Sequence, residues 1–386
     1  MAPVAVTGVG MLTPFGEGLE PLWEALFGDR TALRERPGFP GGASGVVPGR
    51  EAWHRPGRVR RLALDAGRQA LGEARLPREH LARTGLCLGT IVGEAGHGLR
   101  CQDPGLSPAR RAALRAAWSW GTLARRVARR LELGGVVIPV STACASGADA
   151  LGLAAAEIAA GRAPAMVAGG TEAVTPFQWQ GFRRLGALDP GGVHPFDARR
   201  AGTGLGEGAC FCVLEEESQA RKRRAPILGR VLGWGTAADA LSLAAPDPAG
   251  RGLARAARAA LRQAGRSPEE VSFVVAHATG TPTNDRSEAL ALREVFGARL
   301  PGLPVTALKG ATGHCFGASA AIEAAVALAC LRHGSIPPVV GLRDLDPGLV
   351  VQPARQRPRQ VGPGVALALA SGLGGQNTAL VLGGAR

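Results

Sequence analysis

The sequence predicts an α/β fold made of two similar halves, each a largely parallel sheet covered by helices. Short apolar runs rich in Val and Ile alternate with Ala- and Leu-rich stretches of helical length, a pattern typical of strands joined by helical crossovers. A weak internal repeat supports the division, because residues 140–169 and 305–340 both follow the order strand, small-residue turn, Ala-rich helix, Gly-containing turn and strand. We expect the halves to span residues 1–225 and 226–386, related by an approximate twofold axis.

Apolar spacing and turn residues predict the elements of the two halves in order. For the first half they predict a strand at 4–9, a helix at 19–27, a loop at 36–60, a helix at 59–74, a strand at 84–91, a polar loop at 93–107, a helical region at 108–133, a strand at 136–140, a helix at 148–160, a strand at 164–169, an irregular connector at 176–195 and a strand at 209–214. For the second half they predict strands at 227–235, 271–276 and 305–308, helices at 252–264, 285–296 and 317–331, and a strand–turn–strand end at 361–385.

The composition narrows the class of protein. Hydrophobic residues make up 46% of the 386 residues, which is ample for a core, and 45 Lys and Arg against 31 Asp and Glu give a net charge of +14. Such a basic surface suits an acidic partner, which can be nucleic acid, an anionic membrane or an acidic protein. No nucleic-acid-binding motif accompanies the Arg clusters, so nucleic-acid binding rests on charge alone and a gel shift would test it.

Cysteine usage and the absence of targeting signals predict a cytoplasmic protein. The seven cysteines are scattered and form no Cys-x-x-Cys pair, which favours a reducing compartment. Residues 2–6 show no basic stretch of a signal peptide. The longest uncharged stretch, 361–385, contains Pro, Gly, Gln and Asn, so we expect no membrane span.

Cys144 is the candidate nucleophile, because it lies in a small-residue turn between a predicted buried strand and an Ala-rich helix. Unpaired amides and the positive end of the helix dipole favour a thiolate there, although a cysteine that only fills space is the alternative. His277 and His314 also follow strand ends, where sites form in open α/β sheets. A cysteine with two histidines suits acyl transfer, and their wide separation gives none of the short paired spacings of a zinc site, so no metal is expected.

Four segments resemble the motifs of a known family. They are Ser141-Thr-Ala-Cys144-Ala-Ser-Gly147, His277-Ala-Thr-Gly-Thr281, Lys309-Gly-Ala-Thr-Gly-His314 and Gly372-Leu-Gly-Gly-Gln-Asn377. In order and spacing they are similar, over nearly the full chain, to the β-ketoacyl-acyl-carrier-protein synthases, the Cys-His-His condensing enzymes of the ketoacyl synthase I/II type. The resemblance implies a thiolase-like duplicated five-layer α-β-α-β-α fold that is normally dimeric.

The resemblance also implies a reaction and a set of roles. Cys144 would hold an acyl chain as a thioester, while His277 and His314 stabilise the enolate left when malonyl carrier protein loses CO2. That enolate would attack the thioester and lengthen a fatty-acid, polyketide or polyene chain. Backbone N–H groups of Cys144 and Leu373 would form an oxyanion hole. The remaining implied residues are Lys309 and Glu323 in the polar network of the His314 site, Thr279, Thr281 and Leu373 in substrate binding, and Asp285 and Glu288 as supporting residues.

The resemblance implies an acyl carrier protein as partner and no cofactor except the phosphopantetheine which that partner carries. Carrier proteins are acidic, so the basic surface suits one, although a solvated Arg-rich face explains the charge equally. We expect a homodimer, or a heterodimer with a chain-length-factor-like subunit. The chain could itself be such a non-catalytic subunit, but its intact Cys144, His277 and His314 count against that. Leu373 replaces a gating Phe of the family, which hints at a specialised polyketide or aryl-polyene pathway.

Overall fold

The protein is described by a computed structural model that covers residues 4–36, 39–48 and 57–385. Its main sheet contains two groups of five strands with the same internal order, β1-β9-β7-β5-β6 and β10-β16-β15-β11-β12, which meet where β1 pairs antiparallel with β10. The first group is β1 (Val4–Thr13), β5 (Gly85–Gly89), β6 (Val137–Val140), β7 (Ala165–Glu172) and β9 (Gly208–Glu216). The second is β10 (Gly229–Ala238), β11 (Val271–Val275), β12 (Val305–Thr306), β15 (Val365–Gly372) and β16 (Gln376–Gly383).

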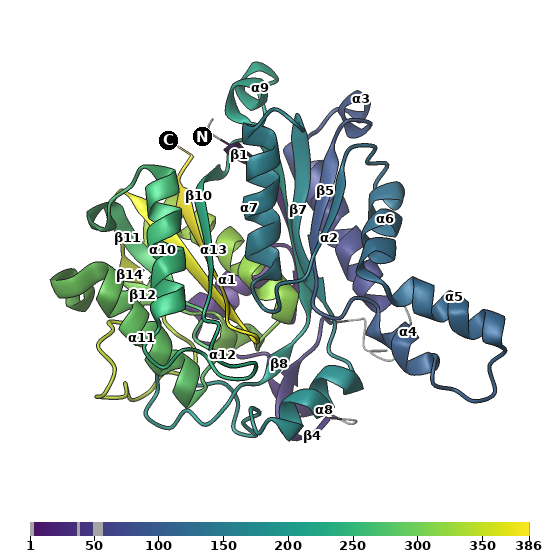
Figure 1. Ribbon diagram of the computed structural model, residues 1–386. Coiled ribbons are helices and arrows are strands. Elements are labelled where there is room, and N and C mark those ends of the chain that lie inside the picture. The colour runs from purple at the N-terminus through teal and green to yellow at the C-terminus, as the bar shows by residue number, and fades with distance from the viewer. Residues whose placement is uncertain (1–3, 37–38, 49–56, 386) are drawn as a thin grey trace.

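Helices lie on both sides of each group of strands and complete five layers, as Figure 1 shows. The outer helices are α2 (Arg58–Ala74) and α6 (Trp120–Arg130) on the first group, and α10 (Arg251–Ala264) and α11 (Pro282–Phe296) on the second. Between the groups lie α7 (Ser146–Ala159) and α13 (Ser319–His333), which contact each other and strands of both halves. The predicted α-β-α-β-α order is therefore confirmed.

Glycines on the strands let the outer helices approach closely, and they do so at matching places in the two halves. A Cβ added to Gly10 of β1 would lie 2.0 Å from the carbonyl oxygen of Ala66 on α2. A Cβ added to Gly235 of β10 would lie 2.3 Å from the carbonyl oxygen of Ala256 on α10. Glycine is required at both places because backbone and helix are in direct contact, which explains part of the high Gly and Ala content.

The prediction of largely parallel sheets was only half right. β5 pairs parallel with β6 and β7, but β9 pairs antiparallel with β7 and with β1, and the second half repeats this pattern. Buried strands are apolar whichever way they run, so direction does not show in their composition. The repeat was also misaligned: the counterpart of β7 is β15, whereas the extended run after Gly334 gives only β13 (Ser335–Ile336).

Several segments expected to be irregular contain helices or strands. The loop predicted at 36–60 contains β4 (Phe39–Gly45), although residues 49–56 lie outside the described part of the chain. The loop at 93–107 contains α4 (Ala95–Arg100), and the connector at 176–195 begins with α8 (Pro176–Arg184), which has a capping box at its start. The helical region at 108–133 divides at Ser119, whose side chain caps α6 by accepting the Thr122 N–H.

The remaining elements are short or lie at the edges. They are β2 (Gly16–Glu17), α1 (Glu20–Phe27), β3 (Arg34–Arg36), α3 (Arg78–Leu81), α5 (Pro108–Trp118), β8 (Leu205–Gly206), α9 (Glu217–Lys222), α12 (Lys309–Thr312) and β14 (Arg359–Gln360), with 3₁₀ turns at Pro268–Glu270, Gly297–Gly302 and Phe316–Ala318. Within the described residues, Phe316–His333, which comprises the last 3₁₀ turn and the central helix α13, is long and apolar enough to cross a membrane, but 83% of it is buried inside the protein.

Candidate active site

Cys144 lies in the tight turn that connects β6 to α7, one residue before the helix cap Ala145. Ala143 has a φ of 51°, a left-handed conformation that non-glycine residues rarely adopt. The Ser146 hydroxyl holds the bend, because it accepts the N–H of Thr142 at 2.9 Å and donates to the carbonyl of Ala143 at 2.6 Å. The turn therefore places a buried sulfur at the start of α7, as the sequence predicted.

Asp149, in the first turn of α7, ties this bend to the second half of the molecule. Its carboxylate accepts the Thr142 hydroxyl at 2.5 Å on one side. On the other side it accepts the indole N–H of Trp234 on β10 at 3.0 Å and the hydroxyl of Thr378 on β16 at 2.8 Å. The position of the nucleophile thus depends on strands of both halves.

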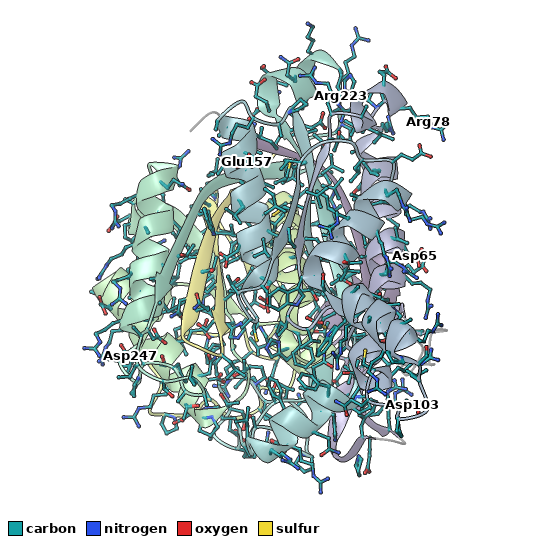
Figure 2. The ribbon with its side chains drawn as sticks, turned by 45° about the vertical axis from the view of Figure 1, so that its right-hand side comes forward. Asp65, Arg78, Asp103, Glu157, Arg223 and Asp247 are labelled. Atoms are coloured by element: carbon teal, nitrogen blue, oxygen red, sulfur yellow. The ribbon has the colours of Figure 1, made fainter. Side chains whose placement is uncertain are left out.

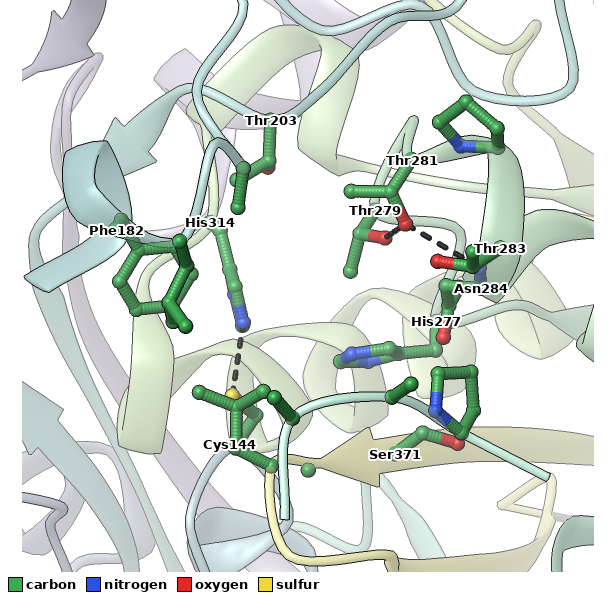
Figure 3. A pocket seen from close by; sticks show the side chains of 18 of the residues that line it. Cys144, Phe182, Thr203, His277, Thr279, Thr281, Thr283, Asn284, His314 and Ser371 are labelled. Atoms are coloured by element: carbon green, nitrogen blue, oxygen red, sulfur yellow. Dashed lines mark hydrogen bonds between the residues drawn. The ribbon is translucent and has the colours of Figure 1, made fainter. Parts of the chain in front are cut away.

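His314 comes from the equivalent connection of the second half, between β12 and α13. Its Nε2 lies 3.0 Å from the Cys144 Sγ, the contact drawn in Figure 3, and its Nδ1 lies 3.1 Å from the Ser319 hydroxyl at the start of α13. The two residues are 170 positions apart in the chain. The structure therefore brings together the cysteine and a histidine that the sequence singled out separately.

His277 follows β11 and points into the same cavity (Figure 3). Its ring centroid is 5.4 Å from that of His314, edge to face. The Lys309 Nζ lies 3.2 Å from the His277 Nδ1, and it donates to the His277 carbonyl and to Glu323 Oε1 at 2.5 Å each. Because an ammonium group only donates, Nδ1 must accept and the ring proton lies on Nε2. Lys309, expected in the His314 network, thus bonds His277 and reaches His314 only through its charge.

Two buried carboxylates hold the loop that carries His277. Glu288 accepts the N–H groups of His277 and Ala278, both at 2.7 Å, and Asp285 accepts the N–H of Gly280 at 3.1 Å. Ala278 and Gly280 both have positive φ values, 37° and 77°, so the loop is tight and needs such external support. Glu288 and Asp285 contact the loop backbone and not the histidine ring, a placement that suits supporting residues.

Burial controls the protonation of the reacting groups. It raises the pKa of Cys144 to about 12, opposed by the Lys309 charge and by backbone N–H groups including that of Leu373. The expected resting thiolate was therefore wrong, because the loss of hydration outweighs the helix N-terminus. Burial first, and then the Lys309 charge, hold the pKa values of His277 and His314 well below the usual range. At neutral pH the site is a neutral thiol beside a neutral imidazole that can accept its proton.

A cavity of about 430 Å³ leads to the sulfur and has a polar side. Thr279 and Thr281 line it, with their hydroxyls 3.0 Å apart, and Leu373 lines it with a side chain that is 41% exposed. The backbone N–H groups of Cys144 and Leu373 both lower the pKa of the Cys144 thiol and so lie close to the sulfur. Among residues 4–36, 39–48 and 57–385 there is no group of three or more His, Cys, Asp or Glu that could hold a metal ion.

A second cavity of about 540 Å³, almost wholly apolar, also reaches Cys144. The two cavities share Cys144, Phe182, Leu185 and Leu373. Phe316 lies in the wall of the second one, stacked on His314 with ring centroids 5.4 Å apart. Sequence reasoning missed Phe182, Leu185 and Phe316, because an apolar residue in a wall gives no motif of its own.

The chain matches two family descriptions in succession, "Beta-ketoacyl synthase, N-terminal domain" over residues 48–220 and "Beta-ketoacyl synthase, C-terminal domain" over residues 228–343. The 3-oxoacyl-[acyl-carrier-protein] synthase 2 of Synechocystis sp. is 32% identical and covers 98% of this chain and 97% of its own length. The chain belongs to the β-ketoacyl synthase family. The resemblance inferred from the four motifs is thereby confirmed.

Two further comparisons extend this assignment across the family. The ketoacyl synthase beta subunit of the tetracenomycin polyketide synthase of Streptomyces glaucescens is 36% identical over 99% of this chain and 98% of that protein. Among solved structures, the ishigamide ketosynthase/chain length factor is 32% identical, superposes with a TM-score of 0.91, and covers 99% of both chains. The β-ketoacyl synthase fold therefore extends over the whole chain, including the described segments outside the two matched ranges.

Proposed function

We propose that the protein is a β-ketoacyl-acyl-carrier-protein synthase that joins an acyl thioester on Cys144 to a malonyl unit with loss of CO2. The observation that carries this proposal is the 3.0 Å contact between the Cys144 Sγ and the His314 Nε2, with the His277 ring 5.4 Å from that of His314. Nucleophile, proton acceptor and hydrogen-bond donors all come from the chain's own side chains and backbone. The phosphopantetheine arrives with the carrier protein and no resident cofactor takes part.

In the first step the acyl chain moves from the carrier to Cys144. The thiol proton passes to the His314 Nε2 as the Sγ attacks the thioester carbonyl, and the phosphopantetheine sulfur leaves and takes the proton. The amides of Cys144 and Leu373 would receive the negative charge on the carbonyl oxygen. The Ser319 hydroxyl can accept from or donate to the His314 Nδ1, so this imidazole can exchange a proton at Nε2 without losing its partner.

In the second step the malonyl unit loses CO2 and forms the new bond. His314, which gave its proton to the departing pantetheine sulfur, first takes a new proton from water at Nε2. The electron pair of the broken C–C bond then passes into an enolate whose oxygen accepts the Nε2–H of His277 and that of His314. The enolate carbon then attacks the Cys144 thioester, the bond from the Sγ to the acyl carbon breaks, and the Cys144 thiolate takes the Nε2 proton of His314. Lys309 keeps the His277 proton on the nitrogen that faces the cavity.

The carrier protein docks at the mouth of the cavities, where three exposed arginines lie. Arg183 and Arg184 end α8 beside the cavity residue Leu185, and Arg286 follows the cavity residue Asn284 on α11. None of the three forms an ion pair within the described residues. The exposed charge of Arg183 and Arg184 beside the cavity supports the docking of an acidic carrier.

Some arginines elsewhere on the surface are instead neutralised by acidic neighbours, although Arg125, Arg129 and Arg130 of α6 form no ion pair within the described residues. Examples are Arg223 with Glu215, Arg251 with Asp247 and Arg162 with Glu157. In Figure 2, Arg223 and Glu157 lie in the upper part of the molecule and Asp247 lies at its lower left. These pairs therefore contribute little net attraction for an acidic protein.

Charge reversal at the mouth tests this docking surface. The triple variant Arg183→Glu/Arg184→Glu/Arg286→Glu should raise KM for an acyl carrier protein by roughly tenfold or more, because each reversal creates repulsion. Its rate with a free pantetheine thioester should change little. The matched control is Arg125→Glu/Arg129→Glu/Arg130→Glu on α6, which reverses three exposed arginines that line neither cavity. A larger KM effect in the control would place docking on α6 instead.

A second chain covers the free edge of the sheet. β6 is the terminal strand of the main sheet, and exposed apolar side chains gather beside it, among them Val136, Trp118, Trp120 and Phe177. An unpaired edge with an apolar border is a site for pairing with another chain. We propose a dimer through this edge, either with a second copy or with a chain-length-factor-like subunit, and native mass spectrometry distinguishes the two.

The second candidate function is a non-catalytic subunit of a ketosynthase heterodimer. It is favoured by the 36% identity to a ketoacyl synthase beta subunit, and the assembled Cys144–His314 pair opposes it. For either function we propose a reducing cytoplasmic location, which the seven free cysteines support.

Intact-mass measurement after incubation with acyl carrier proteins of several chain lengths decides between the two functions. An acyl adduct that disappears in Cys144→Ala supports the enzyme. The absence of any adduct, with every carrier and with small pantetheine thioesters, would favour the non-catalytic subunit.

A further inference from the structure

Helices α2 and α6 contact each other on the outer face of the first half, and arginines line a hollow of about 440 Å³ between them. The described residues that line it are Arg60, Arg61 and Leu64 of α2 and Arg126, Arg129 and Arg130 of α6. Within each set the spacing of three and four residues places the side chains on one face of the helix. We call this hollow the arginine groove.

Close packing of the two helices holds the arginines near one another. Leu62 of α2, Val127 of α6 and Leu131, which caps α6, belong to one buried apolar cluster. A Cβ added to Gly67 of α2 would lie 2.6 Å from the Leu131 Cδ1, so the helices approach closely there. The arginines therefore extend from two rigid elements, which limits how far their charges can separate.

The protein does not neutralise the charge in the arginine groove. Among the described residues, no acidic side chain lines it, and Arg126, Arg129 and Arg130 form no ion pair. The same holds for Arg60 on the opposite wall. Asp65 of α2 lies close in sequence, but its carboxylate accepts a hydrogen bond from Arg68 at 3.4 Å.

The nearby carboxyl of Glu94 does not cancel this charge. It is buried and accepts the backbone N–H of Arg60 at 2.9 Å, and burial raises its pKa although the N–H and the charge of Arg60 oppose the rise. Burial first, and then the charges of Arg60 and Arg126, lower the pKa of His97 on α4. Arginines of both helices thus create one region of positive potential.

The equivalent helices of the second half are neutralised where they meet. α10 and α11 also contact each other, but Arg258 of α10 forms an ion pair there with Glu294 of α11. In the arginine groove, the described charged residues that face each other all carry the same charge. Like charges on adjacent helices repel and lower stability, so a bound anion would relieve a cost that the second half avoids.

We propose that the arginine groove binds an anion that carries two or more linked phosphate groups. Guanidinium groups donate paired hydrogen bonds in a planar geometry that matches the oxygens of a phosphate. A single phosphate carries too little charge to balance arginines on both walls, whereas linked phosphates come closer to doing so. The proposal goes beyond the proposed function, because no groove residue lines either cavity at Cys144.

The lining also defines which part of the ligand is recognised. Among the described lining residues, Leu64 is the one apolar side chain and none is aromatic, so a nucleobase has no ring to stack on. The phosphates are therefore the recognised part. They can come from a soluble polyphosphate or from a lipid headgroup with two phosphates, and the experiments separate these sources.

Titration calorimetry with tripolyphosphate measures the binding directly. The full-length protein should bind one tripolyphosphate per chain in sodium chloride at physiological ionic strength. Sulfate, which lacks a second anionic group, should bind at least about tenfold more weakly. No binding of tripolyphosphate, or equal affinity for sulfate, would overturn the proposal.

Two double variants with the same change in net charge show whether the arginine groove is the site. Arg126→Gln/Arg130→Gln removes two groove arginines and should raise Kd by roughly tenfold or more for each. The matched control, Arg262→Gln/Arg293→Gln, removes two exposed arginines from α10 and α11 and should change Kd by less than about twofold. Equal losses in both would show binding to overall charge and overturn the proposal.

Stability provides a second readout of the same variants. Without ligand, Arg126→Gln/Arg130→Gln should be at least as stable in urea as the native protein, because repulsion is relieved. Tripolyphosphate should raise the Tm of the native protein and of the control, but not that of Arg126→Gln/Arg130→Gln. A ligand-free variant that is less stable would show that these arginines support the fold, against the proposal.

Cosedimentation with phosphatidylcholine vesicles that contain one tenth diphosphatidylglycerol identifies the source of the phosphates. Sedimentation with these vesicles, but not with pure phosphatidylcholine, that is lost in Arg126→Gln/Arg130→Gln supports a lipid headgroup. Protein that stays in solution and binds tripolyphosphate supports a soluble anion. Displacement of bound tripolyphosphate by an acyl carrier protein would place the carrier in the groove and overturn the proposal.

Discussion

The turns that carry Cys144 and His314 occupy equivalent places in the two halves, yet they are built differently. Residues 141–145 alone join β6 to α7, so the cysteine is fixed by a strained bend with Ala143 at a positive φ. Residues 307–318 join β12 to α13, and this longer connection contains α12. The short turn contributes only the Cys144 sulfur to the site, whereas the long connection contributes the His314 imidazole and the buried ammonium of Lys309.

This difference shows how a duplicated scaffold divides the chemistry of one site. A nucleophile needs a fixed position, which a tight turn supplies. Proton exchange and enolate binding need several groups in contact, which only a longer connection can hold. The half with the shorter turn therefore supplies the nucleophile, and the half with the longer one supplies His277, His314 and their partners.

Substituting the two histidines separately should give the largest effects. His314→Ala should slow acylation of Cys144 by about 10²–10⁴-fold, because it removes the proton acceptor 3.0 Å from the sulfur. His277→Ala should leave acylation within a few-fold but reduce malonyl decarboxylation by a similar factor. Intact mass measures the first step and CO2 release the second. Equal acylation by both variants would show that His314 is not the proton acceptor.

Removing Lys309 should affect both stability and chemistry. Lys309→Met leaves the buried Glu323 unpaired and should lower the free energy of unfolding by about 3–5 kcal/mol. It also removes the donor that keeps the His277 proton on Nε2, so decarboxylation should fall by roughly 10²-fold. Urea denaturation and CO2 release are the measurements. The double variant Lys309→Met/Glu323→Leu should recover stability without recovering activity; recovery of both would make Lys309 purely structural.

β7 and β15 are equivalent strands of the two halves, but they end differently. β7 ends at Glu172, whereas β15 ends at Gly372. Burial raises the pKa of Glu172 to about 8. Because a pKa of about 8 exceeds the pKa of a glutamate in the unfolded chain, the folded protein binds this proton more tightly. The resulting contribution to stability is lost as the pH rises through about 8. Between pH 6 and 9 the Tm of Glu172→Gln should therefore fall less than that of the native protein. An equal fall in Tm for the variant and the native protein would contradict this prediction.

Leu373→Phe, in the hairpin that follows Gly372, should give the smallest effect. A larger side chain at the junction of the two cavities narrows the passage for the acyl chain. We expect octanoyl transfer to slow a few-fold while acetyl transfer is unchanged, measured by intact mass. A slower acetyl transfer would show that residue 373 affects the sulfur and not the passage.

The reactive residues were predictable because each follows a strand end and lies in a small-residue motif. Cys144, His277 and His314 were found in this way, and the structure brings them into one cavity. The protonation of Cys144 was not predictable, because it depends on burial by segments far away in the chain. The helix α8 and the apolar cavity beside it were missed for a related reason, since they are defined by contacts among Phe182, Phe316 and Leu373 and not by local spacing.

The carboxylate of Asp149 has a consequence for how the chain can be divided. Two of its three hydrogen-bond donors, Trp234 and Thr378, belong to the other half. If the polypeptide were expressed as two fragments cut near residue 225, the first fragment would keep Cys144 but lose the anchors of its bend. Neither fragment alone should react with an acyl thioester, and mixing them should restore reactivity only to the extent that they reassemble.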